Sequence, residues 1–248
     1  MCNSPKIQHF AFINLFTTHP FGGCAHFGAD MDFNTARYNM VEQQIRPWDV
    51  LDFDLLDVLS DIPRERFVLP QQQDVAYTDQ ALGLANGGKM LEPKVVARMI
   101  QALKLNLTDT VVEIGTGSGY ATAILAKMAG KVITVDIDAE QQHHAQLILS
   151  DLNYTNISYK SCDGLADKLP GAPFSAIYVG GSLPTWPTTL LDQLAEDGRM
   201  VAIIGEAPVM RAILFERQNN QLKETILFET VAPALHSLEI PAPNQFKF

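Results

Sequence analysis

From residue 111 onward, short apolar runs alternate with longer stretches in which apolar residues recur at helical spacing. Such alternation is typical of an α/β fold with a doubly wound, mostly parallel sheet, whose ligands bind outside the carboxyl ends of the strands. Two later strand-like runs predict a C-terminal antiparallel hairpin. The predicted strands are 111–114, 131–135, 157–160, 176–179, 199–204, 209–217 and 225–231, and the predicted helices are 120–129, 139–151 and 188–195.

The chain before residue 111 is predicted to be mainly helical. Apolar residues recur at helical spacing in 36–45 and 53–59, and Pro47 separates these two helices. A loop that contains glycines spans 81–93, and Pro93 is placed as the first residue of an amphipathic helix that runs to about residue 104. Residues 1–30 show no sustained periodicity, so we predict a disordered extension there, with a weak signal peptide as the alternative.

The most informative stretch is the junction between the first strand and the helix that follows it. Three glycines stand there at alternate positions, Gly115, Gly117 and Gly119. Glycines let the backbone turn tightly and let a ligand approach where any Cβ would collide. The free N–H groups of the first helical turn point into the same space. Glu113 closes the apolar strand and is expected to face the ligand from below.

Two classes of cofactor use this geometry, and the spacing of the glycines favours one of them. The dinucleotide fingerprint places its third glycine where this chain has Tyr120, which disfavours an NAD-dependent reductase. The Glu-x-Gly-x-Gly-x-Gly form instead resembles the first motif of S-adenosylmethionine-dependent methyltransferases. An acid such as Glu113 suits a cationic cofactor and would be awkward beside a pyrophosphate. A glycine-rich turn without a ligand remains the alternative, although a plain turn needs only one glycine.

Acidic residues follow the next two predicted strands. Asp136 lies seventeen residues beyond Gly119, where an acid of this kind of sheet accepts hydrogen bonds from ribose hydroxyls. Asp138 is better interpreted as the N-cap of the following helix. Asp163, before Gly164, is expected to reach the adenine amino group. The expected cofactor-binding residues are Glu113, Gly115, Thr116, Gly117, Ser118, Gly119, Asp136, Ile137, Asp163 and Gly164.

Composition and charge exclude several other classes. The 248 residues allow one α/β domain, or one domain with an extension. The formal net charge is −10 and no basic patch is visible, so nucleic acid is a poor partner. No apolar run is long enough for a membrane span. The three cysteines form no Cys-x-x-Cys pair, which favours a reducing cytoplasm and no zinc site, and His143 and His144 do not converge on a metal.

Beyond the glycine motif, the region from about residue 31 to residue 231 resembles the protein-L-isoaspartate O-methyltransferases. The most specific match is the stretch Ile-Pro-Arg-Glu-Arg-Phe-Val at 62–68; other matches lie at 40–45, 93–99, 113–120 and 183–199. The resemblance implies a Rossmann-like methyltransferase sheet and an organisation into an extension (1–30), an N-terminal helical and acceptor-loop region (31–92) and an S-adenosylmethionine-binding domain (93–248).

The resemblance also implies an activity. It is the methylation, with S-adenosyl-L-methionine as cofactor, of the abnormal α-carboxylate of isoaspartyl residues in damaged proteins or peptides. The methyl ester then promotes succinimide formation and repair. The transfer needs no strong base, because a carboxylate is already ionised at pH 7.

One loop departs from the family pattern. Members carry a Gly-Gln-Thr-Ile-Ser-x-Pro-like loop before the helix at Pro93, whereas this chain has Lys89 at the threonine position and Leu91 at the serine position. We therefore assign no catalytic residue. Lys89 is a candidate cation for an acidic acceptor, or a solvated loop lysine, and Asn86 is a further candidate contact. A methyltransferase with another acceptor and a non-catalytic S-adenosylmethionine-binding protein remain the alternative functions.

Overall fold

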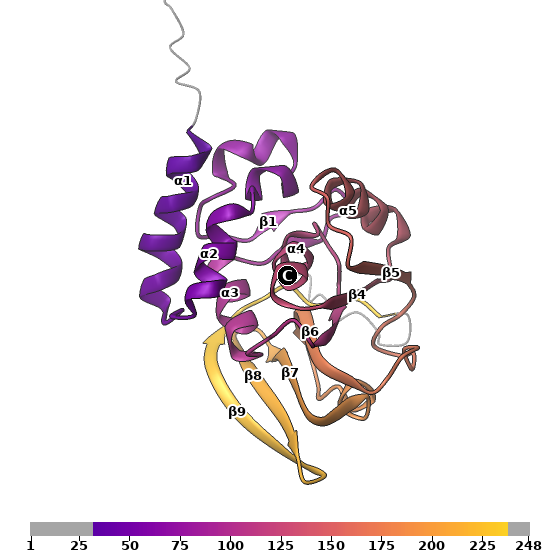
Figure 1. Ribbon diagram of the computed structural model, residues 1–248. Helices are drawn as coiled ribbons and strands as arrows, with labels where there is room; N and C mark the ends of the chain where they lie inside the picture. Colours follow the sequence, from indigo (N-terminus) through magenta and orange to yellow (C-terminus); the bar gives the residue numbers. More distant parts are fainter. Residues whose placement is uncertain (1–31, 238–248) are drawn as a thin grey trace, which may run out of the picture. The chain divides into compact units, whose positions relative to one another are not determined.

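A seven-stranded sheet with the strand order β5-β4-β3-β6-β7-β8-β9 forms the centre of the molecule (Figure 1). The computed structural model describes residues 32–237, and the extension predicted at 1–30 lies outside them. The sheet is parallel from β5 to β7, and β8 and β9 add to β7 as an antiparallel hairpin, which confirms the predicted fold. The strands are β3 (Thr110–Ile114), β4 (Lys131–Asp136), β5 (Ile157–Ser161), β6 (Phe174–Leu183), β7 (Leu194–Glu206), β8 (Val209–Gln218) and β9 (Gln221–Thr230).

Two apolar cores lie on the two faces of this sheet, because successive residues of a strand point to opposite sides. Val111 belongs to the core beneath the N-terminal helices, α4 and α5, whereas Val112 belongs to the core that contains Leu190 and Leu191 of α6. The helices are α1 (Phe33–Asn39), α2 (Phe53–Asp61), α3 (Pro93–Ala102), α4 (Tyr120–Met128), α5 (Ala139–Asp151) and α6 (Thr188–Leu191).

The N-terminal helices belong to the apolar core on one face of the sheet: α3 contacts β6 and β7, and α2 contacts α4. The helix predicted at 36–45 begins earlier, at Phe33, because the carboxylate of Asp32 accepts hydrogen bonds from the backbone N–H groups of Asn34 and Thr35. It continues through α1 into a π-helical segment, η1 (Met40–Ile45), and Pro47 lies in the 3-10 turn η2 (Arg46–Trp48) that separates it from α2. Further 3-10 turns are η3 (Arg64–Phe67) and η4 (Pro70–Val75).

Two predicted elements need correction. The helix predicted at 188–195 ends at Leu191, because the chain turns there and Leu194 already pairs with Phe174 as part of β7. Tertiary strand pairing therefore overrides the local helical pattern. The loop predicted at 81–93 contains a small hairpin of β1 (Leu82–Gly83) and β2 (Lys89–Met90).

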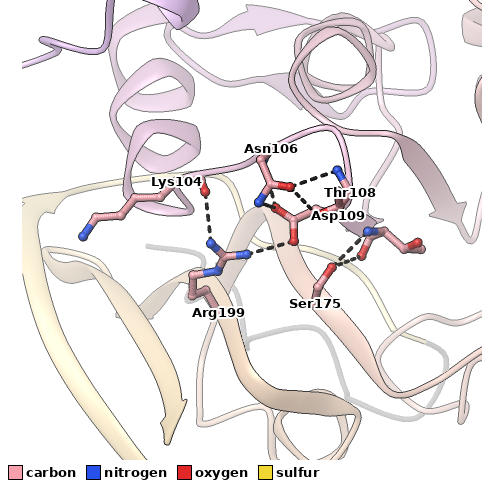
Figure 2. A network of polar contacts seen from close by, with 7 residues as sticks. Lys104, Asn106, Thr108, Asp109, Ser175 and Arg199 are labelled. Atoms are coloured by element: carbon pink, nitrogen blue, oxygen red, sulfur yellow. Dashed lines mark hydrogen bonds and ion pairs between the residues drawn. The ribbon is translucent and has the colours of Figure 1, made fainter.

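A polar network joins the chain before β3 to β7 at the end of the sheet away from the carboxyl ends of the parallel strands (Figure 2). Nη2 of Arg199 donates to the carboxylate of Asp109 at 3.0 Å, and its Nη1 donates to the carbonyl oxygen of Lys104 at 3.0 Å. The other oxygen of Asp109 accepts from the backbone N–H of Asn106 at 2.9 Å. Since Asp109 is only 6% exposed, Arg199 supplies most of the charge that compensates its burial.

Replacing Arg199 by methionine keeps an unbranched apolar stem but leaves Asp109 without its cation. We expect the free energy of unfolding to fall by about 2–3 kcal/mol, because a nearly buried acid loses its charged partner. Urea denaturation measures the change. Arg211→Met is the matched control, since the Arg211–Glu229 pair is exposed and its loss should cost less than about 0.5 kcal/mol. Equal losses in the two variants would contradict the assigned role of Arg199.

Candidate functional site

A cavity of about 640 Å³ opens at the carboxyl ends of the central parallel strands. It is lined by the glycine loop after β3, the ends of β4 and β5, the β1–β2 hairpin, two glycines of β6 and residues 231–236. Its volume falls in the range of sites that bind small molecules and cofactors. β3 pairs with β4 on one side and with β6 on the other, so the cavity lies where the strand order reverses. This is the place where open α/β sheets bind their ligands.

The three glycines of the loop all adopt positive φ angles, of 90° at Gly115, 50° at Gly117 and 85° at Gly119. Gly115 and Gly117 line the cavity. Gly119 does not; it caps α4, and a Cβ there would lie 3.1 Å from Cβ of Ala145 in α5. The third glycine is therefore needed for close packing of two helices, whereas the first two give a ligand access to the backbone.

Asp136 ties the glycine loop to the end of β4. Its Oδ2 accepts from the backbone N–H of Gly117 at 3.0 Å, and its Oδ1 accepts from the backbone N–H of Asp138 at 2.9 Å. Asp136 and Ile137 both line the cavity, and their contact with a cofactor stays a prediction. An ionised carboxylate has about four acceptor positions, so two remain for a ligand that donates hydrogen bonds.

Glu113 lies beneath the loop and not in the cavity, which corrects the expectation that it faces the ligand. The alternation of side chains along β3 puts Ile114 on the cavity wall and turns Glu113 toward α4, where it is 0% exposed. Its Oε2 accepts from the hydroxyls of Thr122 at 2.5 Å and Thr134 at 2.6 Å. Thr134 also shares a hydrogen bond of 2.7 Å with Thr116 of the loop, so this buried chain supports the loop from below.

Two further loop residues have structural contacts instead of a place on the cavity wall. Thr116 is 3% exposed and directs its hydroxyl to Thr134, and Ser118 is 7% exposed and accepts from the backbone N–H of Tyr120 at 3.2 Å. Neither side chain lines the cavity. The sequence pattern did not distinguish these residues from Gly115 and Gly117, because burial within a loop depends on the elements that pack beneath it.

The Asp-Gly pair after β5 lines the cavity, and contact of Asp163 with an adenine amino group stays a prediction. Asp163 accepts from the backbone N–H of Leu165 at 3.0 Å and from the hydroxyl of Ser237 at 2.6 Å. A Cβ on Gly164 would lie 3.0 Å from Cδ1 of Ile114 and Cγ1 of Val135, so a larger residue would push these side chains aside. Asp138 caps α5 as expected, with Oδ1 accepting from the backbone N–H groups of residues 140 and 141.

The loop before α3 places one of its two unusual residues at the cavity. Lys89 is exposed and lines the cavity. Leu91 is 6% exposed and belongs to the apolar core, and its carbonyl oxygen accepts from Nη2 of the fully buried Arg64 at 3.1 Å. Asn86 donates to Asp138 at 2.9 Å and accepts from the backbone N–H of Gly88 at 2.9 Å, so it braces the hairpin against α5.

Sequence reasoning missed the part of the wall that comes from β6 and the C-terminal segment. A Cβ on Gly181 would lie 2.9 Å from the carbonyl oxygen of Pro233, so that segment lies directly on the strand. Ser182 pairs there with Ala234 in a parallel bridge, and Leu235 covers Gly115. Adjacent glycines within a strand signal a close approach of another backbone, and the pair Gly180 and Gly181 could have indicated this contact.

Residues 32–237 hold no group of three or more His, Cys, Asp or Glu residues that could bind a metal ion. Within the same range, no helix is long and apolar enough to span a membrane. His143 and His144 are both exposed on α5.

Burial raises the pKa of Glu113 from the ordinary 4.5 to about 8. Between these values the folded protein keeps a proton that the unfolded chain has lost, so the free energy of unfolding falls as pH rises from about 5 to about 8. The glutamine in Glu113→Gln is neutral at every pH and still accepts both threonine hydrogen bonds. The free energy of unfolding of this variant therefore does not fall with rising pH on account of residue 113. Relative to the wild type, its stability should rise by on the order of 3 kcal/mol across that window.

Urea denaturation at pH 5, 6.5 and 8 measures this difference. Glu229→Gln is the control, because the Glu229 side chain is 70% exposed. Parallel pH profiles for the wild type and Glu113→Gln would show that the buried carboxyl does not hold a proton at neutral pH.

Comparison with known proteins gives a consistent family match. The family model described as protein-L-isoaspartate(D-aspartate) O-methyltransferase matches residues 36–232. A protein-L-isoaspartate O-methyltransferase of Koribacter versatilis is 36% identical over 195 residues, which are 79% of this chain and 88% of the relative. One of Desulfotalea psychrophila is 41% identical over 174 residues, which are 70% of this chain and 81% of the relative.

Solved structures agree on the fold. One protein-L-isoaspartate O-methyltransferase matches with a TM-score of 0.70 and 22% identity, over 81% of this chain and 66% of that chain. Another, from Plasmodium falciparum in complex with S-adenosyl-L-homocysteine, matches with a TM-score of 0.69 and 19% identity, over 84% of this chain and 99% of that chain.

Proposed function

This chain belongs to the protein-L-isoaspartate(D-aspartate) O-methyltransferase family, and from that premise we propose that it transfers a methyl group from S-adenosyl-L-methionine to the α-carboxylate of isoaspartyl residues. The observation that carries the proposal is the cavity bounded by the glycine loop and Asp136. The relative from Plasmodium falciparum is in complex with S-adenosyl-L-homocysteine, the demethylated form of the same cofactor, and has the same fold. We also propose a cytoplasmic location, which rests on the cysteine pattern.

The residues of the cavity fit an S-adenosyl cofactor. Asp136 offers two free acceptor positions for ribose hydroxyls, and Gly115 and Gly117 bring backbone without a side chain to the cavity wall. The apolar side chains of Ile137 and Leu165 are suited to contact with the adenine ring, and Asp163 is suited to its amino group. When bound, S-adenosyl-L-methionine supplies an electrophilic methyl group on a positively charged sulfur. The acids of this wall favour that charge, whereas they would repel a pyrophosphate.

The β1–β2 hairpin brings a cation to the cavity. Lys89 lines the cavity with an exposed side chain, and its charge is suited to hold the carboxylate of an isoaspartyl residue. The carboxylate is ionised at neutral pH, so the protein contributes alignment and exclusion of water. The hydroxyl residues of the family loop are replaced here, and Leu91 packs into the core, so Lys89 is the acceptor-binding candidate of this loop.

Asp136→Asn keeps the shape of the side chain but puts an amide N–H₂ against one of the two backbone N–H donors. We expect the dissociation constant for S-adenosyl-L-methionine to rise at least about tenfold, because hydrogen bonds to a charged acceptor are lost. Equilibrium dialysis with tritiated cofactor measures it. Asp192→Asn, on an exposed site, should leave it unchanged. An unchanged dissociation constant in a folded Asp136→Asn variant would show that Asp136 does not bind the cofactor.

Incubation with an isoaspartyl peptide and tritiated S-adenosyl-L-methionine should give a base-labile methyl ester. Lys89→Met should raise the KM for the peptide about fivefold, the equivalent of roughly 1 kcal/mol for an exposed ion pair. Cofactor affinity should not change. Lys223→Met is the control, because its side chain is 68% exposed on the hairpin. An unchanged KM would exclude Lys89 from acceptor binding.

The changed loop also favours a second candidate, a methyltransferase of the same fold with another acidic acceptor. Tight binding of cofactor without any ester on the isoaspartyl peptide would support that candidate. Tight binding without turnover on any acceptor would support a non-catalytic S-adenosylmethionine-binding protein.

A further inference from the structure

The tip of the β1–β2 hairpin, residues 84–88, belongs to the wall of the cofactor cavity. The hairpin is short, since only two pairs of residues face each other in it. A two-stranded hairpin of this size has little stability of its own, so its position depends on its contacts with the rest of the protein. Met90 fixes the base in the apolar core, whereas residues 85–87 at the tip are exposed. Lys89, the candidate contact of the acceptor, lies between the base and the tip.

Asn86 ties the tip of the hairpin to the start of α5. Its Nδ2 donates to Oδ2 of Asp138 at 2.9 Å, and its Oδ1 accepts from the backbone N–H of Gly88 at 2.9 Å. The first bond holds the tip against α5, and the second closes the turn that leads into Lys89. An aspartate at this position could keep the bond to Gly88 but would lose the bond to Asp138, because an ionised carboxylate has no donor.

Asp138, the partner of Asn86, is in turn held by the carboxylate that is proposed to bind the ribose. The backbone N–H of Asp138 donates to Oδ1 of Asp136 at 2.9 Å. The backbone N–H of Gln141 and the amide of Asn86 lower the pKa of Asp138 below its ordinary value, so its carboxylate is ionised at neutral pH and is a strong acceptor. A path of hydrogen bonds therefore runs from the ribose carboxylate through Asn86 to the turn before Lys89.

We propose that Asn86 is a positioning residue for methyl transfer, and that its bond to Asp138 sets the place of Lys89 at the cofactor cavity. A Cβ on Gly117 would lie 3.5 Å from Cδ1 of Leu84, so the same tip also packs against the glycine loop. The proposal rests on the proposed methyl transfer to isoaspartyl peptides, in which Lys89 holds the acceptor carboxylate. Asn86 acts on the acceptor through Lys89.

An exchange of the two bonded side chains tests this role. Asn86→Asp keeps the turn but sets two carboxylates against each other, so the tip should move away from α5. We expect the KM for the isoaspartyl peptide, measured at saturating cofactor, to rise about fivefold, with kcat within about twofold of the wild type. The pair Asn86→Asp with Asp138→Asn restores the bond with donor and acceptor exchanged. It keeps the net charge and an equally good N-cap, so the KM should return to within about twofold of the wild type.

The combination of Asn86→Asp with Lys89→Met tests whether the effect passes through Lys89. The KM of this double variant should be about fivefold above that of the wild type, as in Lys89→Met alone, and not the roughly 25-fold expected for independent effects. Asn34→Asp is the matched control for an added negative charge, since Asn34 is exposed in the first turn of α1 and does not line the cavity. Its KM should equal that of the wild type.

Saturable binding of cofactor by each variant reports that it is folded. An unchanged KM in Asn86→Asp, a raised KM that persists in the exchanged pair, or an effect that multiplies with that of Lys89→Met would each overturn the positioning role while leaving the proposed activity intact. A KM that stays high in the exchanged pair would trace the effect to the new charge at residue 86 and not to the lost bond. A wild-type enzyme that forms no ester on the peptide would overturn both the proposed function and this role.

Discussion

The bond between the carboxylate of Asp136 and the backbone N–H of Gly117 is the contact on which the rest of the site depends. A loop with three glycines has many conformations available, and ordering it costs more conformational entropy than ordering other residues. Asp136 restricts it from the side, and the buried chain from Thr116 through Thr134 to Glu113 restricts it from below. The loop is thereby prepared for a ligand, so binding does not have to order it.

Two separate contacts hold the loop before α3 to the helices next to the glycine loop, α4 and α5. Asn86 donates to Asp138, and the buried Arg64 donates to the carbonyl oxygen of Leu91 while its guanidinium lies 4.5 Å from the ring centre of Tyr120. Tyr120 is the first residue of α4, directly after the glycine loop. Arg64 belongs to the Pro-Arg-Glu-Arg-Phe-Val stretch that resembles the family most specifically. The cost of burying its charge is offset by its hydrogen bonds and by the aromatic ring, and it joins the two halves of the site.

The sequence predicted what depends on local patterning. Alternating apolar runs identified the sheet and the hairpin, and the glycine spacing located the cavity and Asp136. The corrections concern tertiary contacts. The helix predicted at 188–195 gives way to strand pairing, and Glu113 turns into the core because strand alternation and packing against α4 fix its direction. The adjacent Gly180 and Gly181 are the local signal for the C-terminal wall, but they do not say which segment lies there, since Ala234 pairs with Ser182 far back in the chain.

The central claim is that the cavity over the glycine loop binds an S-adenosyl cofactor and not a dinucleotide. Isothermal titration of the wild-type protein with S-adenosyl-L-homocysteine, and separately with reduced nicotinamide adenine dinucleotide, tests it most directly. We expect a saturable heat signal with one site for S-adenosyl-L-homocysteine and no saturable signal for the dinucleotide. Saturable binding of the dinucleotide, with no heat from S-adenosyl-L-homocysteine, would contradict it.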